Sequence, residues 1–117
     1  MSDLLNVASE QRAARIRELN DAFRTTFRGG KVVMTSSVAA LPDMVRANAL
    51  KTVAEFSQFD GTNDPYKEHD FGAFELCGRT FFWKIDYYDK DLEFGSDDPT
   101  DPTKTTRVLT LMLAEDY

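Results

Sequence analysis

The chain has little cysteine and no long apolar run. Its single cysteine, Cys77, cannot form a disulfide bond within the chain, which is typical of proteins from reducing compartments. No apolar stretch approaches the roughly 20 residues that cross a bilayer. The first residues, MSDLL, form too short and too acidic a stretch for a signal peptide. The sequence therefore argues against a disulfide-stapled secreted domain, and we expect a cytoplasmic protein.

Sequence motifs of common enzymes are also absent. The chain contains no P-loop, no G-x-G-x-x-G fingerprint, no G-x-S-x-G motif and no C-x-x-C pair. The Gly29-Gly30 pair lies between an expected helix and an expected strand, the reverse of a phosphate-binding turn. Because His69 is the only histidine, a zinc site would be short of nitrogen and sulfur ligands. We predict no cofactor.

The material for one packed domain over residues 1–117 is present. Hydrophobic residues make up 42% of the chain and aromatic residues 12%, which favours a folded core over disorder. Charge is divided unevenly, with +2 in residues 1–59 and −8 in residues 60–117. An acidic half disfavours direct contact with nucleic-acid phosphates and permits contact with a basic protein surface. Solubility is the simpler explanation of the same imbalance.

Apolar spacing and turn residues predict an α+β fold. Residues 1–8 are expected to be a frayed lead-in, followed by a helix from Ser9 to Arg28 and a strand over 31–35. A second helix should run from Pro42 to about 56–59. A hairpin of strands 71–76 and 79–88 around Cys77-Gly78 and a final strand over 107–115 complete the list. Residues 36–41 are expected to be a connection, and residues 60–70 and 89–104 loops. The order α-β-α-β-β-β fits an antiparallel sheet of about four strands with two helices on one face, which covers both apolar stripes.

Alternation along strand 79–88 assigns its residues to two faces. Phe81, Trp83, Ile85 and Tyr87 should face the core. The second face would carry Phe82, Lys84, Asp86, Tyr88, Val108, Thr110 and Met112. This mixture is a candidate interface, for a partner or for a second copy of the chain, unless the N-terminal segment or the 89–104 loop folds over it. Lys84 and Asp86, two residues apart on one face, are expected to form a surface ion pair.

The candidate for chemistry is the segment 64–70, DPYKEHD, which contains Glu68, His69 and Asp70. Carboxylates and an imidazole can hold a divalent metal or transfer protons, and Asp86 could join them. These four residues define the alternative function, a small metal-dependent hydrolase or nuclease. Adjacent residues of an extended chain point to opposite sides, so they converge only if the chain bends. The simpler interpretation is that Asp70 caps a turn and His69 closes the loop by hydrogen bonding, and no metal ligand is assigned.

Acidic side chains gather in the loop 89–104 beside aromatic residues. The EF-hand spacing of calcium ligands is absent from this loop. Spaced carboxylates next to aromatic rings can bind Arg and Lys side chains of a protein, and can imitate the phosphates of a nucleic acid. The residues expected to contact such a partner are Asp89, Asp91, Glu93, Asp97, Asp98, Asp101, Tyr88 and Phe82. The alternative is a solvated loop without a partner.

Six segments together resemble one family: RIRELNDAFR (15–24), GGKVVMT (29–35), EHDFGAFE (68–75), FFWKIDYYD (81–89), LEFGSDDPTDP (92–102) and TRVLTLMLAEDY (106–117). They are similar to an uncharacterised family of small alphaproteobacterial proteins, a domain of unknown function often carried on plasmids and mobile elements. The resemblance supplies no catalytic residues. It implies a setting in which small acidic proteins counter host defence by inhibiting restriction or CRISPR nucleases.

The expected function is therefore a small acidic, non-enzymatic protein-binding module, with an anti-defence inhibitor that mimics nucleic-acid charge as its specific form. The expected partner is a protein, of the nucleic-acid-binding or defence type. No membrane and no direct nucleic-acid contact is expected.

Overall fold

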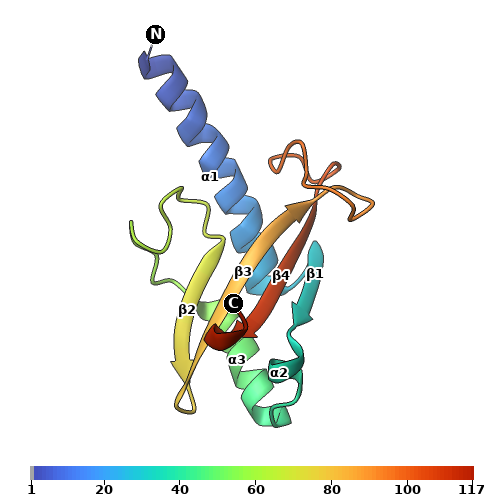
Figure 1. The fold of residues 1–117 in the computed structure, drawn as a ribbon. Helices are drawn as coiled ribbons and strands as arrows, with labels where there is room; N and C mark the ends of the chain where they lie inside the picture. Colours follow the sequence, from blue (N-terminus) through green and yellow to red (C-terminus); the bar gives the residue numbers. More distant parts are fainter. Residues whose placement is uncertain (1) are drawn as a thin grey trace.

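The computed structural model describes the backbone of residues 2–117 and the side chains of residues 6–117. Figure 1 shows a twisted four-stranded sheet, with the long first helix on one side and the C-terminal turn on the other. The elements, in chain order, are α1 (Ser2–Thr26), β1 (Gly30–Met34), α2 (Ser36–Ala39), α3 (Asp43–Glu55), β2 (Phe71–Leu76), β3 (Arg79–Tyr88), β4 (Thr106–Leu113) and the 3-10 turn η1 (Ala114–Asp116). The predicted α+β class is confirmed, with three α-helices among these residues where two were expected.

The sheet is mixed, with the strand order β1-β4-β3-β2. β3 pairs antiparallel with β2 and β4, but β1 runs parallel to β4, with Val32 opposite Leu109. The predicted antiparallel sheet was therefore wrong at this edge. β1 pairs with the last strand of the chain rather than with a neighbour in sequence. An alternation pattern tells which face a residue occupies and does not tell which way its partner strand runs.

α1 begins earlier than the sequence indicated. It starts at Ser2 rather than at Ser9, since the residues between them include neither glycine nor proline and do not interrupt a helix. The expectation of a frayed lead-in over these residues was wrong. The helix ends at Thr26, after which Phe27 and Gly29 take positive φ values of 57° and 94°. This left-handed ending is close to the predicted position.

The second helical region is divided in two. The connection expected over 36–41 contains α2, and α3 begins directly after Pro42, as predicted to within one residue. α3 ends at Glu55, because Phe56 is already in an extended conformation.

No helix within the described residues combines the length and the apolarity that crossing a membrane would require.

The core lies between the helices and the face of the sheet that packs against them. Phe81, Trp83 and Ile85 of β3 are buried there, as their alternation predicts. The helices and β4 supply the rest, including Phe23, Val38, Ala49, Val53, Leu109, Leu111 and Leu113. Gly72 in β2 makes room for the indole, because a Cβ at this position would overlap Nε1 of Trp83. The hairpin turn is the predicted one, with Cys77 and Gly78 at φ values of 54° and 74°.

C-terminal residues cover part of the second sheet face. Phe82 packs edge-to-face against both Phe71 and Tyr117, with ring centroids 5.2 and 5.8 Å away. Asp116 in η1 accepts a hydrogen bond of 2.8 Å from the hydroxyl of Thr35, which ties the C-terminal turn to the end of β1. The sequence had indicated the N-terminal segment or the 89–104 loop as the cover. The covering segment here is the one that follows β4.

Candidate functional site at the loop end of the sheet

Two loops lie at the same end of the sheet because of the strand directions. Residues 56–70 lead into β2, and residues 89–105 join β3 to β4, so both lie where β3 finishes. α1 passes beside both loops (Figure 1). Its Arg17 donates a 3.0 Å hydrogen bond to the carbonyl of Lys67 in one loop. Its Arg12 pairs with Asp98 in the other at 3.2 Å. The helix therefore connects the two regions in which the sequence places its candidates.

His69 closes the first loop onto α1. Its Nδ1 lies 2.9 and 3.0 Å from the two carboxylate oxygens of Asp21, which requires a proton on Nδ1. Its Nε2 lies 3.6 Å from Oδ2 of the buried Asp64, whose Oδ1 accepts the backbone N–H of His69 at 3.0 Å. The ring also stacks on Phe59 at 3.7 Å. Loop closure by His69 was predicted, whereas the capping carboxylate is Asp64 rather than Asp70.

Arg24 joins α1 to the end of α3. Its side chain is 4% exposed, and one guanidinium nitrogen donates to the carbonyls of Val53 and Phe56, each at 2.9 Å. The other terminal nitrogen donates to Asp21 at 3.1 Å, so Asp21 holds both Arg24 and His69. The guanidinium lies 5.3 Å from the ring centroid of Trp83. A cation among the last carbonyls of a helix compensates their partial negative charge.

Asn20 is the centre of a second buried network. Its Nδ2 donates to the carbonyl of Glu68 at 2.9 Å and to the Tyr87 hydroxyl at 2.8 Å, and its Oδ1 accepts from Nε of Arg107 at 2.7 Å. The Tyr87 hydroxyl donates to the carboxylate of Glu68 at 2.8 Å. Burial raises the pKa of Tyr87 and lowers the pKa of Arg107. Arg107 also donates to the carbonyl of Pro99, so the network reaches the second loop.

The residues of the predicted catalytic cluster contact different partners. Glu68 accepts from Tyr87, and His69 contacts Asp21. Asp70 is half-buried, and this burial, followed by the charge of Glu68, raises its pKa. Asp86 forms the predicted ion pair with Lys84, at 3.0 Å. Among the side chains that the structure describes, residues 6–117, no three or more His, Cys, Asp or Glu gather in a way that could hold a metal ion.

Sequence reasoning missed Asn20 and Arg24. A signal for Asn20 was present, because it lies four residues after Ile16 and three before Phe23, inside the apolar stripe of α1. A polar residue within such a stripe is buried and needs hydrogen-bond partners. Arg24 carried no comparable signal, since its position beside the stripe also suits a solvent-exposed arginine.

The acidic loop is held by its own carboxylates. Asp98 accepts from the hydroxyl and the backbone N–H of Thr100 at 2.6 and 3.1 Å. Asp101 does the same with Thr103 at 2.6 and 2.9 Å. These hydrogen bonds lower the pKa values of Asp98 and Asp101. Asp89 accepts the backbone N–H of residue 93 at 3.0 Å. Three of the six loop carboxylates predicted to contact a partner therefore cap turns within the loop.

The other three carboxylates belong to what we call the acidic tip, residues 91–94 together with Asp97. Within the described residues, the carboxylates of the tip form no ion pair or hydrogen bond. Phe94 lies between Glu93 and Asp97 in the sequence, and its side chain is 72% exposed. The tip is held to the sheet by a bridge between Tyr88 and Gly95. Phe82 and Tyr88, the two aromatic residues predicted to contact a partner, are half-buried in β3.

Comparison with known proteins places the chain in a family. The family of proteins of unknown function DUF3768 matches residues 34–116, so the chain belongs to it. The match includes both loops, β2, β3 and β4, and it excludes α1 and most of β1. No curated protein and no solved structure matches the chain.

Proposed function

We propose that this member of the DUF3768 family is a non-enzymatic protein-binding module, and that its acidic tip binds a basic protein surface. The observation that carries the proposal is the combination of unpaired carboxylates and an exposed aromatic ring on a turn that is held in place by hydrogen bonds. Aromatic side chains are enriched at the centre of protein interfaces, where they often contribute much of the binding energy. Phe94 is an exposed aromatic side chain, and the carboxylates of the tip are suited to Arg and Lys.

The turn is ordered before any partner arrives, which favours affinity. Asp89 caps it, the bridge from Tyr88 to Gly95 closes it, and Asp98 and Asp101 order the residues that follow. Binding then needs little further loss of loop entropy. The three negative charges of the tip also raise the association rate with a basic surface, in a salt-dependent way.

The use of the polar side chains supports binding over catalysis. Glu68, His69 and Tyr87 have the chemistry of acids and bases, but their contacts join the loops to α1. This arrangement stabilises the end of the sheet from which the tip projects.

The partner class follows from the chemistry of the tip. A groove that normally binds nucleic acid offers the arginines and lysines to which three carboxylates and an aromatic ring are complementary. An inhibitor of a nucleic-acid-binding defence enzyme is the specific form of the proposal, in agreement with the setting that the resemblance implies.

The test is capture of a partner from a host lysate by the immobilised protein, at low and high salt. A triple charge reversal, Asp91→Lys with Glu93→Lys and Asp97→Lys, should abolish capture, and Phe94→Ala should weaken it at least tenfold. A control variant that reverses two exposed acids elsewhere, Glu55 and Glu75, should capture normally. Excess duplex DNA should release the partner from the wild type. Capture that survives the triple reversal would refute the role of the tip.

A further inference from the structure

The part of α1 that precedes residue 13 has described side chains from residue 6 onward, and these have little contact with the rest of the domain. Residues 6–12 are all exposed, and Figure 1 shows the helix continuing well past the sheet. Helical segments of this length are marginal in water unless they pack against something. The projecting part of α1 is therefore where a further contact would be stabilising.

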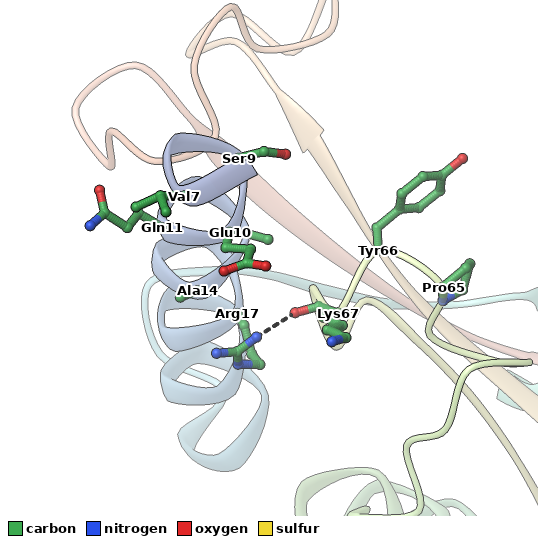
Figure 2. Close-up of a pocket in the computed structure, with 10 residues that line it drawn as sticks. Val7, Ser9, Glu10, Gln11, Ala14, Arg17, Pro65, Tyr66 and Lys67 are labelled. Atoms are coloured by element: carbon green, nitrogen blue, oxygen red, sulfur yellow. Dashed lines mark hydrogen bonds between the residues drawn. The ribbon is translucent and has the colours of Figure 1, made fainter. Parts of the chain in front are cut away.

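A groove of about 730 Å³ runs along this part of the helix and the loop beside it. Its helix wall includes Val7, Glu10, Ala13, Ala14 and Arg17, and its other wall is formed by residues 65–67 (Figure 2). Tyr66 stands on the loop side of the groove with 76% of its surface exposed. The hydrogen bond from Arg17 to the carbonyl of Lys67 closes one end. The groove is thus lined by apolar side chains and by the charged side chains of Glu10 and Arg17.

The charge pattern on this part of α1 is complementary to the same pattern on a second α1 that runs antiparallel to it. Glu10 and Arg17 lie seven residues apart and project from the same side of α1, and neither forms an ion pair with any other described residue (Figure 2). If a second α1 lies antiparallel on the first, with a two-fold axis between Ala13 and Ala14, Glu10 of each copy faces Arg17 of the other. Two ion pairs form in this way, and alanines at the crossing point allow the helix axes to approach closely.

We propose that the occupant of the groove is α1 of a second copy of this chain, in an antiparallel, two-fold symmetric pair. The interface is isologous, so it closes at the dimer and does not propagate into a filament. The acidic tips take no part in this contact. The dimer therefore presents two of them, which would increase avidity for a repetitive partner.

The first test is sedimentation equilibrium of the full chain over a range of concentrations. The wild type should form a dimer, and its dissociation constant should increase with salt. Glu10→Arg creates two repulsive pairs in place of two attractive ones and should raise the dissociation constant at least about tenfold. Arg17→Glu should do the same. The combination of Glu10→Arg with Arg17→Glu restores complementary pairs and should recover the dimer.

The second test fixes the register by cross-linking. Cys77 is first replaced by Asn, which suits the positive φ at this turn position. In that background Ala14→Cys should form an intermolecular disulfide under mild oxidation, and the exposed helix position Ala22→Cys should not. Circular dichroism checks that each variant is folded. A wild type that is monomeric at every concentration overturns the proposal, as does a dimer that is indifferent to Glu10→Arg or that the charge-swapped variant fails to restore.

Discussion

Replacement of Arg24 by methionine tests whether this side chain joins α1 to α3. Methionine keeps most of the volume beside Trp83 and removes the charge, so the change isolates the polar contacts. Two backbone carbonyls at the end of α3, those of Val53 and Phe56, would lose a charged donor at 2.9 Å each. Hydrogen bonds to charged groups contribute about 1.5–3 kcal/mol each.

The expected loss is smaller than the sum of these contributions. Nε of Arg24 is buried without a hydrogen-bond partner, so the substitution also removes an unfavourable group. The ion pair with Asp21 adds little, because the carboxylate is 38% exposed and screened by solvent. We therefore expect Arg24→Met to lower the free energy of unfolding by about 3 kcal/mol, a large part of the stability of a small domain.

The measurement is urea unfolding at pH 7, followed by tryptophan fluorescence, since Trp83 contacts the guanidinium. Arg28→Met, at an exposed position after the same helix, is the control and should change stability by less than about 0.5 kcal/mol. A loss below about 1 kcal/mol for Arg24→Met, with an unchanged m-value, would show that the carbonyls find water instead and would refute the reasoning.

Two further predictions concern β2 and the residue before it. Gly72→Ala should lower the free energy of unfolding by about 2–3 kcal/mol in the same assay, since its Cβ would overlap the buried indole of Trp83, whereas Gly61→Ala in open space should be nearly neutral. Asp70→Asn should stabilise the protein at pH 7, because a raised folded-state pKa means that ionisation of Asp70 costs stability as the pH rises through that value. The advantage should vanish near pH 3, where the carboxyl is protonated in both states, and a gain that is independent of pH would contradict the assignment.

Local chemistry explains which parts of the fold the sequence reveals. The hairpin is predictable to the residue, because alternation in β3 and the Cys77-Gly78 turn are both encoded within a few neighbouring positions. The direction of β1 is not, because its partner strand lies more than 70 residues away in the chain. The role of His69 in closing a loop could be inferred from the residues around it. Its partner Asp21 could not, since the pair is separated by 48 positions.

Contacts between residues far apart in the chain also decide which segments the domain needs in order to fold. The family match covers residues 34–116, yet the contacts that hold its loops come from Asn20, Asp21 and Arg24 of α1. α1 also supplies the buried ring of Phe23 to the core. Without it, Arg107 and the carbonyls at the end of α3 would be left without their donors and acceptors in an apolar interior.

We therefore expect residues 30–117, expressed alone, to lack a cooperative unfolding transition, although they contain every strand of the sheet. Addition of a synthetic peptide of residues 1–29 should restore the transition, and the same peptide with Asn20→Leu and Arg24→Met should not. Far-ultraviolet circular dichroism during thermal unfolding would distinguish these outcomes. If the shortened chain unfolds cooperatively on its own, the buried networks centred on Asn20 and Arg24 are not needed for folding. The role of α1 would then be to pair two copies of the chain rather than to complete the fold of one.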